Sequence, residues 1–326
     1  MIEQPLPRYL GNIGANPIVN LGVIENKGLE LELAYRPRQS GNLQWNIAAN
    51  FSVIKNKILE LGNLGIDPAT GQPREYIQSG NTRSQVGRSI GEYYVVRTDG
   101  IFQSQREIDE SGAQSAYAKP GDIRYRNLVD DGSNDDITDK DRAFAGSPWP
   151  KFTTGLQFNI SYKAFSVNLQ LYGAFGQKIY NDVIRDLDGM GYSNYRKGLT
   201  YWTAEKPNTP TPRLGVAYAT GQPNDPQVDQ GIVSNGRGDS DRWIEDGSYL
   251  RIRNLEIAYL LPKSLLNRAK LTDTRIFISG QNLATFTRYQ GLDPDIVGAN
   301  ANLEPGVDTG NYPSSRILSV GLSIGF

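Results

Sequence analysis

Three short stretches of this 326-residue sequence contain residue types that could carry chemistry. Residues 127–142, NLVDDGSNDDITDKDR, concentrate carboxylate and amide oxygens, the hard ligands that suit Ca²⁺. Residues 237–240 read RGDS, which contains an integrin-binding tripeptide. Asp293 and Asp295 flank a proline and could be considered as the carboxylate pair of a glycoside hydrolase.

Each stretch also has a simpler interpretation. The acidic stretch has broken ligand spacing, and we interpret it as a solvated loop. Its carboxylates include Asp131, Asp135, Asp136, Asp139 and Asp141. RGDS is short enough to occur by chance, and the Asp293–Asp295 pair has no other catalytic constellation beside it. We therefore predict no catalytic residue, no metal site and no cofactor, and we do not expect an enzyme.

The composition excludes several other kinds of site. The sequence has no histidine and no cysteine, which removes histidine general bases and triads, histidine-containing zinc sites, disulfides and thiolate nucleophiles. The net charge of −1 gives no electrostatic argument for nucleic acid. No apolar run approaches the roughly 18 residues of a membrane helix, and the start, MIEQPLPRYL, has neither the basic nor the apolar region of a signal peptide.

The clearest structural signal is the stretch TGLQFNISYKAFSVNLQLYGAF, residues 154–175. Its large apolar residues have even numbers up to Tyr162 and odd numbers from Phe165 onward. Because side chains alternate along a strand, this switch of phase predicts two strands joined at Lys163 and Ala164. Pairing Tyr162 with Phe165 then matches apolar with apolar residues on one face and amides with amides on the other, whereas a shift of one residue would mix every pair. Lys-Ala is not the usual Asn-Gly of a two-residue turn, so the turn type stays open.

The two faces of this hairpin allow two interpretations. One face presents Leu156, Phe158, Val167 and Leu169, and the other presents Gln157, Asn159, Asn168 and Gln170. In a soluble extracellular β-sandwich, such as a glycan-binding or adhesin module, the apolar face would cover the core. In a transmembrane barrel it would contact lipid, and the polar face would line a wet lumen.

Other segments show the same alternation, and their connections are unequal in length. Alternating strands are predicted at 29–35, 43–53, 248–261, 274–289 and 315–326, with a helical turn at 263–271. Connections after Tyr35, Tyr162 and Leu261 are short, whereas residues 62–148, 181–246 and 290–313 form long connections. Outer-membrane barrels have short periplasmic turns and long extracellular loops. Counting directions along the chain gives seven or nine strands, the uncertain pair lying within residues 77–102.

The last eight residues, SVGLSIGF, resemble the C-terminal β-signal that barrel-assembly machinery recognises in outer-membrane proteins. The positions that carry this resemblance are Ser319, Gly321, Ile324 and Phe326. An amphipathic final strand that ends in an aromatic residue favours the barrel over the sandwich.

Several ordered blocks resemble the SusC/RagA family of TonB-linked outer-membrane transporters of Bacteroidetes. They include NLGVIENKGLELEL, VGRSIGEYYVVRTDGIFQSQREID, KPGDIRYRNLVDDG, DRWIEDGSYLRIRNLEIAYLLPKSLL and RIFISGQNLATFTRYQGLDPD. The resemblance implies an all-β fold in which residues 1–326 form the C-terminal part of an antiparallel transmembrane β-barrel. Plug and N-terminal domains are expected to be absent from these residues. Plugged barrels have about 22 strands, so seven or nine would form only part of one.

The resemblance also implies a function in the cell outer membrane, the import of a bulky nutrient. An oligosaccharide is the expected substrate and a peptide the alternative. The implied partners are a SusD-like surface lipoprotein, TonB acting through the plug, the barrel-assembly machinery and outer-membrane lipid. Tyr162, Phe165 and Tyr259 near the short turns would join the periplasmic aromatic girdle.

Two loop features follow from the same resemblance. The family often carries an Asp/Asn-rich calcium-like stretch at 127–142, but here Val129 replaces an expected ligand. Six aromatic residues lie in or beside the long loops, where they could stack on sugar rings or pack the loops. They are Trp149, Trp202, Trp243, Tyr192, Tyr195 and Tyr201.

Overall fold

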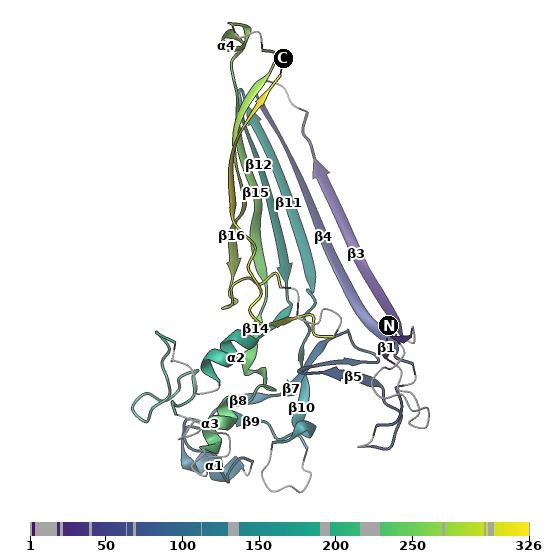
Figure 1. The fold of residues 1–326 in the computed structure, drawn as a ribbon, viewed down its shortest axis with the longest axis vertical. Coiled ribbons are helices and arrows are strands. Elements are labelled where there is room, and N and C mark those ends of the chain that lie inside the picture. The colour runs from purple at the N-terminus through teal and green to yellow at the C-terminus, as the bar shows by residue number, and fades with distance from the viewer. Residues whose placement is uncertain are drawn as a thin grey trace.

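The computed structural model places one long antiparallel sheet upright above a region of folded loops (Figure 1). It describes residues 2–3, 18–19, 22–38, 41–62, 64–67, 70–111, 113–129, 137–189, 196–215, 229–268, 271–296, 298 and 303–325. Within these ranges, no helix has the length and apolar character needed to cross a bilayer.

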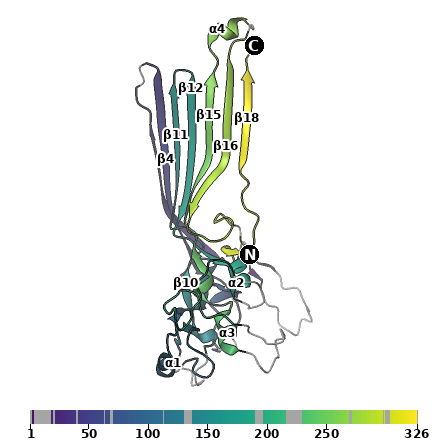
Figure 2. The same cartoon turned by 90° about the vertical axis from the view of Figure 1, so that its left-hand side faces the viewer.

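The long sheet has seven strands in the order β18-β16-β15-β12-β11-β4-β3, so chain neighbours are also sheet neighbours. Figure 2 shows these strands side by side. Their bounds are β3 Val23–Tyr35, β4 Leu43–Glu60, β11 Phe152–Tyr162, β12 Phe165–Phe175, β15 Tyr249–Leu260, β16 Thr274–Thr287 and β18 Ile317–Ile324. The expected all-β antiparallel class is confirmed, with the lower of the two predicted strand counts.

The predicted hairpin register is confirmed at every pair. Tyr162 lies opposite Phe165, Phe158 opposite Leu169, and Asn159 opposite Asn168. Lys163 has a positive φ of 53°. A positive φ at the first of two turn residues is typical of a type II′ turn, whose twist suits the flanking strands.

The possible pair of membrane strands within residues 77–102 is not part of the long sheet. These residues form β5 (Tyr76–Ser79), β6 (Thr82–Gln85), β7 (Glu92–Val96) and β8 (Thr98–Ile101) in smaller sheets of the loop region. Their strands of four or five residues are too short to span a bilayer, which takes about 9–11.

The remaining elements are short. The strands are β1 Ile2–Glu3, β2 Ile18–Val19, β9 Ile123–Tyr125, β10 Arg142–Gly146, β13 Lys178–Asn181, β14 Ile244–Asp246 and β17 Val307–Asp308. The helices are α1 Gln105–Ser111, α2 Asp182–Asp188, α3 Gln230–Asn235 and α4 Lys263–Arg268, with 3₁₀ turns η2 Asp139–Asp141 and η3 Asp241–Trp243. Helix α4 occupies the predicted helical turn and lies at the short-turn end, away from the other helices (Figure 1).

The buried clusters of the described residues lie in the loop region. Tyr93, Tyr180 and Trp243 form one of them, and all three are nearly inaccessible to solvent. The Tyr93 hydroxyl donates to the carbonyl of Gly306 at 2.6 Å and accepts from the Tyr180 amide at 3.1 Å. Burial raises the pKa of Tyr93. The loops are therefore a packed body that closes one end of the sheet.

Candidate functional site: the two faces of the long sheet

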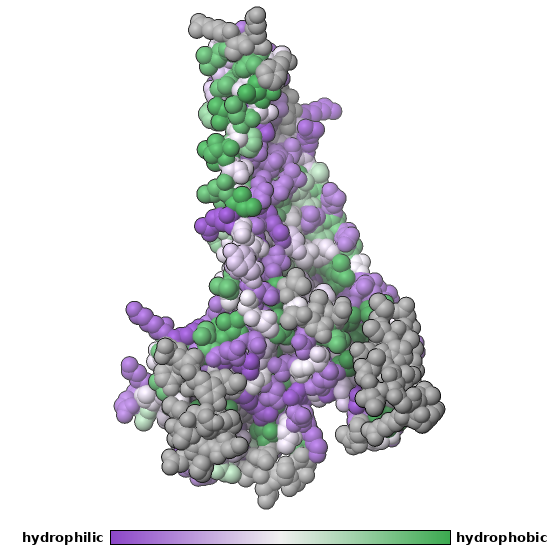
Figure 3. Space-filling view, in the orientation of Figure 1, coloured by the Kyte–Doolittle hydropathy of each residue, from purple (hydrophilic) through white to green (hydrophobic). Residues whose placement is uncertain are grey.

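The long sheet has one continuous apolar face. Cross-strand pairs keep the phase set by the 154–175 hairpin: Leu156 lies opposite Leu171, Leu169 opposite Leu255, and Val320 opposite Ile278. The four predicted lipid-facing residues, Leu156, Phe158, Val167 and Leu169, share this face. Figure 3 shows apolar side chains along one side of the upright sheet and polar side chains along the other.

No second layer of the described chain covers the apolar face. Leu33 is 62% exposed, Ile278 59% and Val320 77%. A sandwich would bury such residues under a facing sheet about 10 Å away, and a water-soluble monomer rarely exposes so large an apolar surface. The sandwich interpretation therefore finds no support in the structure.

Aromatic residues mark both ends of this face. At the short-turn end, the rings of Phe165 and Tyr259 lie 4.7 Å apart and those of Tyr35 and Trp45 lie 5.6 Å apart. At the loop end, Phe152 stacks on Phe175 at 4.9 Å and contacts Phe51 at 5.4 Å.

The spacing of the two aromatic rows can be worked out along β11, which runs from Phe152 to Tyr162. Ten residue steps at about 3.4 Å give about 34 Å along the strand. A tilt of about 35–45° reduces this to about 24–28 Å along the membrane normal, which matches the apolar band of about 25 Å on outer-membrane barrels.

The opposite face is polar and partly hydrogen-bonded across strands. The Asn159 amide donates to the Asn46 side-chain oxygen at 2.7 Å. All four predicted lumen residues, Gln157, Asn159, Asn168 and Gln170, lie on this face. A hollow on it is lined by the side chains of Glu32, Asn50, Gln157, Gln170, Tyr172 and Arg253.

Comparison with known proteins finds similar sequences and a similar structure over the whole chain. The chain is 31% identical to TonB-dependent receptor P3 of Formosa agariphila over 334 aligned residues, which cover 100% of the chain and 31% of that receptor. It is 24% identical to TonB-dependent receptor SusC of Bacteroides thetaiotaomicron over 97% of the chain and 28% of SusC. A solved structure of the RagAB peptide transporter superposes with a TM-score of 0.71 at 22% identity, covering 100% of the chain and 32% of the matched chain.

Over its whole length, the chain is homologous to TonB-dependent receptors, SusC among them. It spans about a third of the length of the relatives it matches. No protein-family profile matches it. These relatives are named as receptors and transporters, which agrees with the expectation that the chain is not an enzyme.

Within this SusC/RagA-type sheet, the Asp293–Asp295 pair forms part of an ionic clamp. Asp293 accepts from the buried guanidinium of Arg251, and Asp295 lies 3.3 Å from Arg251 and 3.1 Å from Arg253. Burial alone would raise the pKa of Asp293, but hydrogen bonds from the Asp295 and Ser314 amides and from Arg251 lower it overall. A glycosidase acid needs a raised pKa, so this carboxylate is unsuited to that role.

The clamp is not predicted from the sequence, although Arg251 and Arg253 lie within the predicted strand 248–261. Its geometry depends on a register shift in β15, where Asn254 pairs with Gln170 and Ile252 with Leu171. The extra residue, Arg253, lies 4.8 Å from the ring of Tyr172 on the polar face. Such a bulge re-aims a side chain, and here it moves the apolar positions of β15 from odd numbers at Leu255 to even numbers at Ile252.

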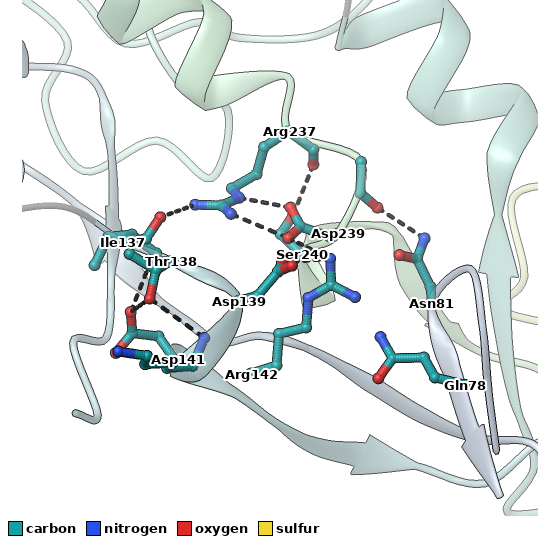
Figure 4. Close-up of polar contacts among 12 residues, drawn as sticks. Gln78, Asn81, Ile137, Thr138, Asp139, Asp141, Arg142, Arg237, Asp239 and Ser240 are labelled. Carbon is teal, nitrogen blue, oxygen red and sulfur yellow. Dashed lines mark hydrogen bonds and ion pairs between the residues drawn. The ribbon is translucent and has the colours of Figure 1, made fainter. Parts of the chain in front are cut away.

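The RGDS residues are part of the packed loop region (Figure 4). The Arg237 guanidinium pairs with its own Asp239 at 2.6 Å, and Arg142 reaches the same carboxylate at 3.1 Å. Ser240 is fully buried. Because Arg237 and Asp239 neutralise each other, neither charge is available to an integrin-type partner. This agrees with the interpretation that RGDS occurs here by chance.

The acidic stretch is described only in part. Asp141 is buried and accepts from the backbone amides of Leu128 at 2.7 Å and Thr138 at 2.8 Å, which caps a turn (Figure 4). Asp139 pairs with Arg142 at 2.8 Å. Asp131, Asp135 and Asp136 lie outside the described residues, and the described ones contain no cluster of three potential metal-binding side chains.

The described loop tryptophans have structural partners. Trp243 is buried and donates to the Arg237 carbonyl at 2.9 Å, Trp202 donates to Gln103 at 2.9 Å, and Trp149 donates to the Ile90 carbonyl at 2.7 Å. Tyr201 is half-buried, and Tyr192 and Tyr195 lie outside the described residues. The tryptophans thus support loop packing.

Three of the four residues of the predicted C-terminal β-signal belong to the edge strand β18. Ser319 and Gly321 occupy polar-face positions of β18, Ile324 belongs to the apolar phase, and Phe326 lies outside the described residues. Among the described residues, strand β18 pairs only with β16. Its other edge therefore presents backbone donors and acceptors that a membrane protein must satisfy with another strand.

Proposed function

We propose that this chain forms the C-terminal part of the barrel wall of a TonB-dependent importer in the outer membrane. The observation that carries the proposal is the exposed apolar face bounded by aromatic rows about 24–28 Å apart, which fits a bilayer. Similarity over the whole chain supports it, because the matched relatives are named as TonB-dependent receptors.

In this proposal, residues 1–326 supply seven of about 22 strands, and other parts of the polypeptide pair with the free edges of β3 and β18. Leu156, Phe158, Val167 and Leu169 contact lipid, whereas Gln157, Asn159, Asn168 and Gln170 face the lumen or plug. Barrel-assembly machinery recognises the final strand through Ser319, Gly321, Ile324 and Phe326. The loop region lies at the extracellular mouth.

The imported nutrient is proposed to be a bulky oligosaccharide, delivered with a SusD-like surface lipoprotein and driven by TonB through the plug. A peptide is the second candidate, because the structurally similar RagAB complex is described as a peptide transporter. The polar lumen face suits either substrate, since amides and hydroxyls can bind sugar hydroxyls or peptide groups.

The experiment is a deletion of the complete gene that encodes this chain, followed by growth and uptake assays on labelled oligosaccharides and on labelled peptides. We expect uptake of one substrate class to fall, to return on complementation, and to vanish when TonB is inactivated. Unchanged uptake of both classes, or uptake that continues without TonB, would contradict the proposal.

A further inference from the structure

At the loop end of β3 and β4, the apolar face continues into a patch of lysines. Leu29 and Val53 form the last apolar pair. The next pairs on the same face are Lys27 opposite Lys55 and Glu25 opposite Lys57. We call Lys27, Lys55 and Lys57 the lysine patch.

The patch has more positive charge than its neighbours neutralise. Lysines directly opposite on one face repel each other. Lys27 pairs with Glu25 at 2.6 Å and its side chain is still 78% exposed. Lys55 and Lys57 are exposed and form no ion pair with any residue in the described ranges. Strand β3 pairs with β4 along this stretch, whereas the pairing of β11 with β4 ends at Ser52. Among the described residues, the patch therefore lacks two anionic partners.

The height of the patch fits the headgroup layer of a bilayer. Lys55 lies four residues beyond Phe51 of the aromatic row. Four steps correspond to about 13 Å along the strand, or about 10 Å along the membrane normal at a barrel tilt. Headgroup layers extend about 5–8 Å beyond the hydrocarbon, and lysine side chains extend several ångströms toward polar groups.

We propose that the lysine patch binds the phosphate-bearing headgroups of outer-leaflet lipids. This proposal rests on the proposed function, because it places the apolar face in the outer membrane with the loops outside. Anionic headgroups would relieve the repulsion between Lys27 and Lys55 and hold this part of the wall at a fixed depth.

The test uses the full-length transporter, purified in detergent and titrated in mixed micelles with a bisphosphorylated lipid A. The variant carries Lys27→Gln, Lys55→Gln and Lys57→Gln. A matched control carries Lys197→Gln, Lys206→Gln and Lys263→Gln, which remove the same charge from exposed positions outside the patch. Further arms replace the probe with dephosphorylated lipid A, or add inorganic phosphate at equal phosphate concentration. Heat-modifiable migration on gels is scored for every protein.

Each surface lysine contributes about fivefold to binding an anionic membrane. With Lys27 discounted for Glu25, we expect the triple variant to bind lipid A at least about 25-fold more weakly than the parent, with the control unchanged. Dephosphorylated lipid A should bind weakly to the parent, and inorganic phosphate should not compete. Three results would overturn the lysine-patch proposal and leave the proposed function standing: equal binding by the variant, equal binding of the dephosphorylated lipid, or competition by inorganic phosphate. A parent without heat-modifiable migration would overturn the proposed function as well.

Discussion

Arginine substitution at Leu169 tests the face assignment most sharply. Leu169 lies between Phe158 and Leu255 on the apolar face, four residues from Phe165 and six from Phe175, so it is near the middle of the aromatic-bounded band. An arginine on the lipid face at the bilayer midplane costs about 2–4 kcal/mol. Gln157 is exposed on the polar face at a neighbouring position, where an arginine can remain hydrated.

We therefore expect Leu169→Arg to lower the free energy of unfolding by about 2–4 kcal/mol and Gln157→Arg to change it by less than about 1 kcal/mol. The assay is urea unfolding of the full-length protein folded into vesicles, with outer-membrane abundance as a second readout. Equal losses for the two variants would refute the face assignment, and so would a harmless Leu169→Arg combined with a damaging Gln157→Arg.

Three further perturbations test the loop end. Arg251→Ala should lower the free energy of unfolding by about 3–5 kcal/mol and speed proteolysis of residues 288–316, because it leaves the buried Asp293 carboxylate without its ion-pair partner. Arg253→Ala, at the exposed end of the clamp, should change both quantities little. Tyr93→Phe should lower the free energy of unfolding in urea by about 1 kcal/mol, because the hydroxyl's hydrogen bond to the Gly306 carbonyl is lost while that carbonyl still accepts from the Tyr180 amide at 3.0 Å; a change below the error of the measurement would contradict this. Burial alone would raise the pKa of Asp229, but hydrogen bonds from Arg213 and Lys119 lower it to about 2, below the usual aspartate value of 3.8. The stabilisation from ionised Asp229 is thus complete above the pKa of the unfolded chain and is lost as pH falls toward 2. Protease resistance around α3 should therefore drop between about pH 4 and pH 2, and Asp229→Asn should make that drop smaller.

The sequence predicted the wall better than the loops, for a physical reason. A strand exposed to two different media must alternate, and the switch of phase at Lys163 is readable because both strands of the hairpin obey that rule. Every pair from Leu156–Leu171 to Tyr162–Phe165 followed from it. The same logic identified the strands at 29–35, 43–53 and 274–289.

The loop region obeys no such period. Its strands of two to five residues are held by contacts between residues distant in sequence, such as Tyr93 with Gly306. Residues 77–102 therefore show no alternation that would distinguish these short strands from a membrane strand. The Arg251 clamp was out of reach for a similar reason, because it joins β15 to a carboxylate 42 residues away. The lysine patch could have been found from the sequence, since Lys27, Lys55 and Lys57 continue the phase of Leu29 and Val53.

The most direct test of the central claim is a scan of depth along β12 in the membrane. This chain has no native cysteine, so single cysteines can be placed within it from Phe165 to Leu171 of the full-length protein and spin-labelled in vesicles. Collisions with oxygen, which partitions into lipid, are compared with collisions with a water-soluble nickel complex. We predict a period of two, with Val167, Leu169 and Leu171 reached by oxygen and Ser166, Asn168 and Gln170 shielded from it. Accessibility without that alternation, or nickel contact at Leu169, would contradict a lipid-facing wall.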